Sequence, residues 1–442
     1  MKDSFKQYFQ ALIGEEEAQA FFDAISAKET RRGIRINSLK TDRSFMKNWL
    51  EENAYEVKES PFSRDSLELK GRGDQWSLKL PYFSGFTYPQ DPSSSFVVDV
   101  LDPQPHEMVI DMTAAPGGKT THIAQRMKNT GVLFANDMDT RRLKALHSNL
   151  ERLGIWNAVV LRMNAHKITL MYPEMFDRVL LDPSCSGEGL LNTHNGKPEF
   201  WSPKAMKRYS NEQFSLLCSA FRLLKPGGRL VYSTCTLNDV EDDKVALKLL
   251  KKFPQAQIIE DYPNHAPEQI GSLKGVRFWP QKTNTKGFFC IAITKTEAIG
   301  LVPEEETPRK LKSPASKMIR TVEKMMEKEY GLTEFPWEWV QRDDFLFGVS
   351  KELMSLHLPY THSLSFPIYK DQSLTHTAAL WVGLQKKMGV ELSTDQLEDF
   401  FNLQWLPIKI DKEYSLLRYK DFPLGIARKA GDKLAPQLPR MY

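Results

Sequence analysis

A chain of 442 residues and 50.9 kDa is too long for a single hydrophobic core, so we expect two to four domains. Hydrophobic residues make up 41% and charged residues 26%, which are ordinary globular values and exclude a fibrous or disordered chain. The formal net charge of +4 identifies no partner by itself.

Residues 1–90 are predicted to form a small α+β domain that begins with helices. The first segment, MKDSFKQYFQALIGEEEAQAFF, mixes charges into a helical apolar pattern and lacks the apolar core of a signal peptide. No apolar run approaches the roughly 18 residues that cross a bilayer. The sequence therefore predicts a soluble cytoplasmic protein with no membrane partner, in which disulfides are not expected.

From about residue 104, strand, loop and helix patterns alternate along the chain. This alternation is typical of a mostly parallel, doubly wound α/β sheet. We expect residues 91–298 to form one such catalytic domain. Its predicted strands are 108–112, 131–138, 157–163, 176–182, 228–235 and 286–295.

Two helices between these strands have clear patterns, at 140–154 and 203–225. Ser202 is a predicted N-cap for the second helix, with Pro203 at its first helical position. The segment KPGG (225–228) is expected to break the chain before the next strand.

The residues after this domain divide into a linker and a C-terminal region. Segment 299–318 is rich in Pro, Glu and basic residues and is predicted as a linker. Residues 319–442 contain short aromatic strands, turns and at least one helix. The last part, 409–442, carries eight Lys or Arg against four Asp or Glu. Such runs are usually solvated faces, but this one is compatible with a phosphate-backbone partner.

A glycine-rich turn follows the first predicted strand, which ends in Asp111. Gly117 and Gly118 allow backbone N–H groups to approach a ligand, and the helix N-terminus that follows favours negative charge. Asp137 ends the second strand, where a carboxylate can accept hydrogen bonds from ribose hydroxyls. The turn is not G-x-G-x-x-G, so S-adenosylmethionine fits as well as a nucleotide, and a purely structural turn is the alternative.

Two of the four cysteines lie at predicted strand ends. Cys185 follows Asp182 at the tip of the fourth strand and Cys235 ends the fifth, at the sheet edge where ligands bind. A buried packing role for each, or a disulfide between them, is the alternative. Cys218 and Cys290 fall on apolar patterns and are predicted to be core residues. The chain has no C-x-x-C pair, so no metal site is expected.

Two cysteines beside an acid suit methyl transfer to an unactivated aromatic carbon. Cytosine C5 becomes nucleophilic when a thiolate adds to C6 while an acid protonates or hydrogen-bonds N3. Removal of the C5 proton and expulsion of the thiolate must follow. A second cysteine near the first could assist that step.

The motifs AAPGGKT, LLDPSCSGEG and YSTCTL, in this order, resemble the Fmu/Sun (Nop/Rsm) family of RNA cytosine-5 methyltransferases. RINSLK, QDPSSSFVVDVL and RFWPQKTNTKGFF extend the resemblance over roughly 30–295. It implies the class I S-adenosylmethionine-dependent methyltransferase fold, which is Rossmann-like with a mostly parallel sheet. It also implies S-adenosylmethionine as the cofactor.

The resemblance implies roles for individual residues. Cys235 matches the nucleophile, Cys185 the cysteine that assists product release, and Asp182 the acid shared between cofactor and cytosine. Lys119 stands where the family places its active-site lysine. The residues that match cofactor-binding positions are Thr113, Ala114, Ala115, Pro116, Gly117, Gly118, Lys119, Asp137, Arg142, Asn164 and Asp182.

The sequence departs from the family pattern at three places. Ser184, not Pro, precedes the release cysteine. Asn164 stands where an Asp near the adenine is common, and the usual E-N-E reads Glu241-Asp242-Asp243. None of these changes removes a catalytic group, so an active enzyme is expected.

The C-terminal region resembles the PUA-like α+β RNA-binding region of the bacterial RsmF-type members, which methylate small-subunit ribosomal RNA. The resemblance implies ribosomal RNA or the small ribosomal subunit as partner. Arg428, Lys429, Lys433 and Arg440, beside aromatic strands, suit phosphate contacts and base stacking, and an ordinary basic surface is the alternative. We expect a monomer.

Three other functions remain open. A transfer RNA cytosine-5 methyltransferase would use the same chemistry on a different substrate. An RNA-binding assembly factor that has lost catalysis is disfavoured by the retained cysteines, and a dinucleotide-dependent oxidoreductase by the missing G-x-G-x-x-G.

Overall fold

The structure is a computed structural model. It describes residues 2–437, except 28–31, 72, 74–75, 195–200, 264–265, 268, 271–272, 302, 304–308, 360–361 and 372. Among the helices formed by these residues, none has the length and apolar character needed to cross a bilayer.

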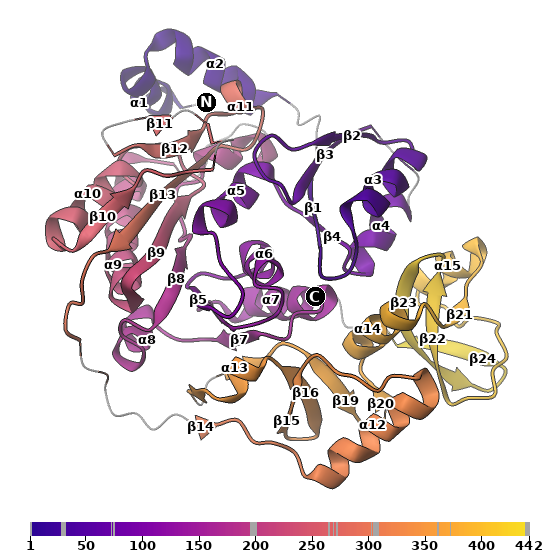
Figure 1. Cartoon of the computed structure of the whole chain (residues 1–442). Helices are drawn as coiled ribbons and strands as arrows, with labels where there is room; N and C mark the ends of the chain where they lie inside the picture. Colours follow the sequence, from indigo (N-terminus) through magenta and orange to yellow (C-terminus); the bar gives the residue numbers. More distant parts are fainter. Residues whose placement is uncertain are drawn as a thin grey trace.

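A ten-stranded sheet forms the centre of the molecule (Figure 1). Its strands are β5 (Met108–Asp111), β6 (Val132–Asn136), β7 (Ala158–Leu161), β8 (Phe176–Leu181), β9 (Leu224–Thr234), β10 (Ala256–Ile259), β11 (Gln269–Ile270), β12 (Gly275–Phe278), β13 (Phe288–Lys295) and β18 (His362–Leu364). The order is β11-β12-β13-β9-β8-β5-β6-β7-β18, with β10 beside β13. Strands β5 to β9 are parallel, whereas β13 runs antiparallel to β9. The predicted doubly wound sheet is confirmed.

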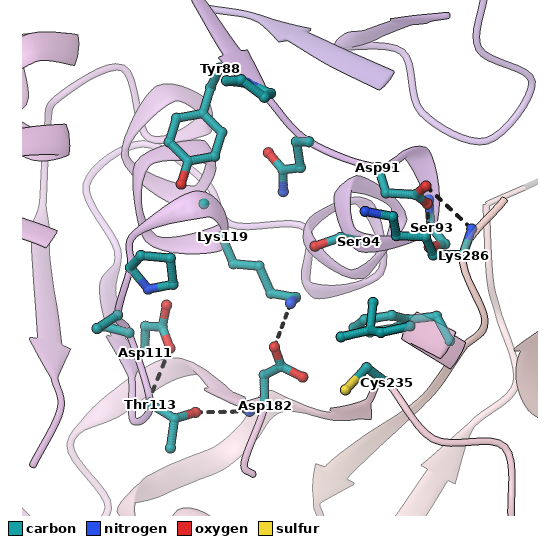
Figure 2. A pocket seen from close by; sticks show the side chains of 18 residues that line it. Tyr88, Asp91, Ser93, Ser94, Asp111, Thr113, Lys119, Asp182, Cys235 and Lys286 are labelled. Atoms are coloured by element: carbon teal, nitrogen blue, oxygen red, sulfur yellow. Dashed lines mark hydrogen bonds and ion pairs between the residues drawn. The ribbon is translucent and has the colours of Figure 1, made fainter. Parts of the chain in front are cut away.

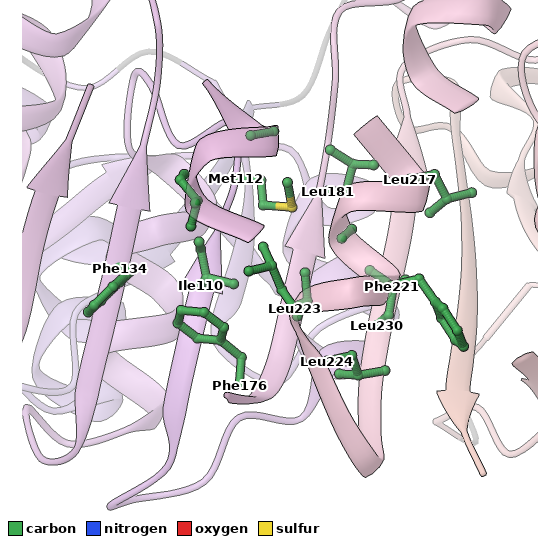
Figure 3. Packing of buried hydrophobic residues seen from close by; sticks show 14 of the residues in the cluster. Ile110, Met112, Phe134, Phe176, Leu181, Leu217, Phe221, Leu223, Leu224 and Leu230 are labelled. Carbon is green, nitrogen blue, oxygen red and sulfur yellow. The ribbon is translucent and has the colours of Figure 1, made fainter. Parts of the chain in front are cut away.

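Helices cover both faces of this sheet, because successive strand residues point to opposite sides. Val109 packs with α5 (Pro92–Leu101), α6 (Gly118–Arg126) and α7 (Thr140–Leu153). Ile110 packs with α8 (Ala165–Met171), α9 (Pro203–Leu223) and α10 (Asp243–Lys252). Figure 3 shows the second of these layers, where Leu217 and Phe221 of α9 lie against the strands.

The start of α9 matches the sequence expectation, but its end does not. Ser202 caps the helix by accepting a hydrogen bond from the backbone N–H of Ala205, and Pro203 is the first helical residue. The KPGG segment was expected to precede the strand, yet β9 already begins at Leu224 and pairs there with Phe176. A bulge follows before regular pairing resumes, and Gly227, with a φ of +76°, permits it.

The N-terminal residues form two separate packing units. Helices α1 (Asp3–Ile13) and α2 (Glu15–Ser26) pack against η1 (Glu188–His194) and α11 (Pro280–Thr283) of the catalytic domain, through Trp201 and Trp279 among others. The second unit contains a four-stranded antiparallel sheet. It contains β1 (Arg32–Ile36), β2 (Glu56–Glu59), β3 (Ser66–Lys70) and β4 (Thr87–Pro89), with α3 (Arg43–Glu52) and α4 (Trp76–Phe83).

The C-terminal region contains two further four-stranded sheets, β15-β16-β19-β20 and β21-β22-β23-β24, and the pair β14-β17. Its elements are β14 (Arg309–Lys310), α12 (Ser316–Tyr330), β15 (Glu338–Arg342), β16 (Phe345–Val349), α13 (Lys351–Met354), β17 (His357–Leu358), β19 (Pro367–Lys370), β20 (Ser373–Leu374), α14 (His376–Lys386), β21 (Val390–Glu391), α15 (Thr394–Phe401), β22 (Tyr414–Tyr419), β23 (Phe422–Ala430) and β24 (Lys433–Gln437). Helix α12 begins at Ser316, inside the segment that was expected to be a linker.

The C-terminal region contacts both the central sheet and the N-terminal unit. Strand β18 extends the central sheet by pairing antiparallel with β7. Phe422 is fully buried against the N-terminal unit, with its ring centroid 4.7 Å from that of Trp49. Ser84 donates a hydrogen bond of 2.9 Å to the carbonyl of Pro423. The regions flanking the catalytic domain therefore share one hydrophobic cluster.

Candidate active site

A cavity of about 310 Å³ opens at the carboxyl ends of β5 and β8. The chain order of the sheet reverses between these two strands, and this is where open α/β sheets bind ligands. Of the residues expected to form the site, eight line the cavity: Thr113, Ala114, Ala115, Pro116, Gly118, Lys119, Asp182 and Cys235. Gly117, Asp137, Arg142, Asn164 and Cys185 lie outside its lining.

The glycine turn is shaped to leave room beside the helix N-terminus. Gly117 precedes α6 with a φ of +108°, in the region that side-chain-bearing residues rarely adopt. A Cβ at Gly118 would lie 3.3 Å from the ring of Tyr88, which also lines the cavity. Asp111 supports the turn, because its carboxylate accepts hydrogen bonds from Thr120 (2.7 Å) and from the backbone of Thr113. Burial raises the pKa of Asp111 to about 6.

Three of the predicted cofactor-binding residues form hydrogen bonds with neighbouring backbone groups of the chain: Asp137, Arg142 and Asn164. The Asp137 carboxylate accepts a hydrogen bond from the backbone N–H of Ala115 (3.2 Å), and Arg142 lies 3.6 Å from it. Arg142 also donates to the carbonyl of Ala115. Asn164 caps helix α8 by accepting from the backbone of His166 (2.9 Å). Asp137 and Arg142 therefore hold the glycine turn, and Asn164 starts the next helix.

Lys119 and Asp182 form an ion pair inside the cavity (Figure 2). The second carboxylate oxygen of Asp182 accepts a hydrogen bond from Ser233 (3.2 Å). Its backbone N–H donates to Thr113 (3.1 Å), which links the tips of β8 and β5. Cys235 lies beside Asp182 in Figure 2. The carboxylate is thus fixed from two sides next to a thiol.

The sulfur atoms of Cys185 and Cys235 lie 2.7 Å apart, and both cysteines are free thiols. The hydrogen bond to Cys235 raises the pKa of Cys185 well above its ordinary value, and burial adds to this effect. Cys185 therefore remains a protonated thiol at neutral pH. Cys218 and Cys290 are buried in the hydrophobic core, as predicted.

Beneath the two thiols lies a buried polar network that the sequence did not reveal. The Ser186 hydroxyl lies within hydrogen-bond distance of the carboxylates of both Glu188 (2.7 Å) and Glu241, and can donate to one of them. The Asn238 amide donates to both carboxylates, at 3.0 Å each. Glu188 and Glu241 are fully buried. The network joins the loop that carries Cys185 to the segment after Cys235, so it fixes the distance between the thiols.

The network predicts a pH dependence of stability. Burial, and then the Glu241 charge, raise the pKa of Glu188 from 4.5 to about 7. The folded protein therefore binds this proton more tightly than the unfolded chain does. The resulting stabilisation is complete below about pH 4.5 and is lost as pH rises through about 7.

We expect Glu188→Gln to remove this contribution, which is on the order of 3 kcal/mol. The measurement is urea denaturation at about pH 4.5 and about pH 8. The difference in the free energy of unfolding between the two pH values should be smaller in the variant than in the wild type. Glu212→Gln, at an exposed position of α9, is the control. An unchanged difference in Glu188→Gln would show that Glu188 ionises normally in the folded protein.

Several residues of the cavity wall were not singled out from the sequence. Tyr88, Gln90 and Asp91 come from the end of the N-terminal unit and the start of α5, and Lys286 and Phe288 from the approach to β13. Phe288 lies below Lys119, whose ammonium is 4.8 Å from the ring centroid. The motif QDPSSSFVVDVL contains two of these residues and was the available signal.

Comparisons with known proteins agree with this geometry. A sequence profile described as "16S rRNA methyltransferase RsmB/F" matches residues 98–294. The ribosomal RNA small subunit methyltransferase F of Klebsiella pneumoniae is 30% identical over 449 residues, which cover 95% of this chain and 92% of the relative. The protein of the same name from Aeromonas salmonicida is 30% identical over 469 residues, with 100% and 96% covered.

Solved structures show the same fold. A methyltransferase homolog protein from Pyrococcus horikoshii is 29% identical with a TM-score of 0.59, covering 67% of this chain and 95% of that one. NSun6 from Pyrococcus horikoshii, solved with SFG, has a TM-score of 0.61 at 24% identity. The match covers 67% of this chain and 98% of that one.

Proposed function

Because the chain belongs to the family of ribosomal RNA small subunit methyltransferase F, we propose that it methylates C5 of a cytosine in small-subunit (16S) ribosomal RNA. It has the class I methyltransferase fold, and its cofactor is S-adenosylmethionine. The observation that carries the proposal is the pair of free thiols at the tips of β8 and β9, beside the Lys119–Asp182 ion pair.

The cavity fits this cofactor. Glycine at position 118 leaves space that a side chain would fill against Tyr88, and the N-terminus of α6 favours the carboxylate of the methionine part. We propose that Thr113 to Lys119 hold that part and that Asp137 accepts hydrogen bonds from the ribose. When bound, S-adenosylmethionine supplies the methyl group that C5 accepts.

Cys235 is the proposed nucleophile because its side chain lines the cavity whereas that of Cys185 does not. The Cys235 thiol passes its proton to the neighbouring Asp182 carboxylate, the sulfur adds to C6 of the cytosine, and the electron pair of the C5–C6 bond moves toward N3, which receives that proton. Asp182 shares a proton with N3, and Lys119 and Ser233 keep its carboxylate oriented. These contacts hold the acid in place before the base arrives.

Release of the product reverses the addition. Solvent water takes up the proton at C5, the electron pair of that C–H bond forms the C5–C6 double bond again, and the bond between C6 and sulfur breaks with its electron pair on Cys235. Cys185, which keeps its proton, can donate a hydrogen bond to the departing Cys235 thiolate and so stabilise it. Without that donor the adduct should persist.

The target cytosine must be unpaired or flipped out, because stacking in a helix hides C6. We propose that the C-terminal region, as a PUA-like unit, holds the surrounding RNA through Lys429 and Lys433. Arg428 lies 3.3 Å from Glu413, so its charge is partly neutralised within the protein. Arg440, which was also singled out, lies outside the described residues.

The test is a methylation assay with tritiated S-adenosylmethionine and three separate substrates: deproteinised small-subunit ribosomal RNA, intact small subunits, and bulk transfer RNA. We expect label in ribosomal RNA or subunits, and nuclease digestion should recover it as 5-methylcytidine. Label in transfer RNA alone would show that transfer RNA is the substrate and would leave the proposed chemistry unchanged. No label in any RNA, with intact binding of S-adenosylmethionine, would indicate an assembly factor.

A further inference from the structure

A second cavity, of about 300 Å³, adjoins the catalytic one. It lies over β1, α4 and β4 of the N-terminal unit. The two cavities share Pro89, Gln90, Asp91 and Lys286 in their linings. The proposed reaction does not use this second cavity.

Gln90 forms a wall common to both cavities and has an unused hydrogen-bond donor. Only 7% of its surface is exposed. Its oxygen accepts a hydrogen bond of 2.8 Å from Arg35, and because a guanidinium only donates, the amide orientation is settled. The amide Nε2 is buried and has no hydrogen-bond partner within the described part of the chain. Such groups are rare in folded proteins, and a bound ligand would supply the missing partner.

Arg35 keeps that amide in place. It is fully buried, and its other nitrogens donate to Thr121 (2.6 Å) and Gln125 of helix α6. The amide of Gln90 is therefore fixed by the same helix whose N-terminus begins at the catalytic cavity. A fixed donor loses little freedom when it binds a ligand.

Tyr82 offers an aromatic surface in the second cavity. Its side chain is 36% exposed, and the guanidinium of Arg152 lies 3.8 Å from its ring centroid. The arginine supports the ring from behind and also donates to the Tyr82 carbonyl. An exposed ring held in this way is a stacking surface for a base.

The charges around the cavity favour an anion. Arg32 and Lys286 both line it. Asp91 is the one carboxylate among the described residues of the lining. It already accepts hydrogen bonds from the backbone and hydroxyl of Ser93 and from the backbone of Lys286. Lys286 lies on the wall shared with the catalytic cavity, where a phosphate linking two nucleotides would pass.

We propose that the second cavity binds the unpaired nucleotide next to the target cytidine in the RNA. Tyr82 stacks on its base, Gln90 Nε2 donates to one of its oxygens, and Arg32 and Lys286 contact the linking phosphate. This inference rests on the proposed function, because it needs a target base in the catalytic cavity. It makes the neighbouring nucleotide a determinant of substrate choice.

The test uses short unpaired RNAs with a central cytidine and an abasic nucleotide on one side or the other. With the wild type, removal of one of the two neighbouring bases should raise KM for methylation by about tenfold, and removal of the other should not. Tyr82→Ala should raise KM for the intact RNA by a similar factor and should show no further loss with the abasic RNA. Binding of S-adenosylmethionine should not change.

Two further variants separate a binding role from a structural one. Gln90→Glu keeps the acceptor for Arg35 and replaces the donor by an anion, so KM should rise while kcat is retained. Tyr209→Ala is the matched control, since its ring is also backed by an arginine, Arg208, at 4.8 Å, but lines neither cavity.

Methylation of the intact RNA without any effect of an abasic neighbour would overturn the subsite and leave the proposed function standing. If no RNA is methylated, the proposed function fails. The binding of RNA to the second cavity can still be tested by measuring the affinity for the same RNAs by fluorescence anisotropy. Equal affinity of wild type and Tyr82→Ala would then refute it.

Discussion

Replacing Cys235 by alanine is expected to abolish methylation, whereas replacing Cys185 is expected to trap RNA on the protein. The first change removes the only thiol that lines the cavity among the described residues, so the loss in kcat should be at least about 10³-fold. The second leaves the nucleophile but removes the hydrogen-bond donor 2.7 Å from its sulfur. The adduct should then form and persist.

Denaturing gels with end-labelled RNA measure the trapped species, and methyl incorporation measures turnover. The double variant Cys185→Ala, Cys235→Ala should form no adduct, which would place the covalent bond on Cys235. Cys218→Ala, which changes a buried cysteine of helix α9 outside the site, is the control for an effect of thiol loss alone. Methyl turnover by Cys235→Ala would reject Cys235 as the nucleophile. A covalent adduct formed by Cys235→Ala would show that the two cysteines have exchanged roles.

Asp182→Asn is expected to lower kcat by about 10²- to 10⁴-fold, the usual contribution of an acid–base group. The amide can still accept the hydrogen bond from Ser233 but can no longer share a proton with N3 as a carboxylate does. It also leaves the Lys119 ammonium without its counter-ion. Affinity for RNA should change far less than kcat, because the interaction strengthens only in the transition state.

Single-turnover methylation with saturating RNA measures this effect. Asp177→Asn is a matched control, because Asp177 belongs to strand β8, which Asp182 directly follows, and pairs with a lysine, Lys225, at 2.7 Å. It lies at the amino end of the strand, away from the cavity, and its variant should keep nearly full kcat. Comparable losses in both variants would point to a strand-wide structural effect and argue against a chemical role for Asp182.

The sequence was sufficient for the five parallel strands β5 to β9 and for β13, because local patterns encode them, whereas β10, β11, β12 and β18 were not predicted. Each predicted strand is a short apolar segment bounded by turn residues, and helix α9 carries its own cap at Ser202. Strand tips follow from strand ends, so the sequence alone assigns Asp182 and Cys235 to one edge of the sheet. The glycine turn directly follows β5, so the same reasoning places it at this edge.

Contacts between distant segments were decided only by the tertiary structure. The 2.7 Å distance between the two thiols depends on β8 and β9 being neighbours and on the buried Glu188–Glu241 network beneath them. The pairing of β18 with β7 joins residues about 200 positions apart, for which no local pattern exists. The motif that contains Gln90 does not show what its side chain contacts, and Gln90 becomes a fixed donor only because Arg35 occupies its oxygen. Periodicity and turn chemistry are local properties of the chain, whereas partner choice among buried polar groups depends on which segments packing brings together.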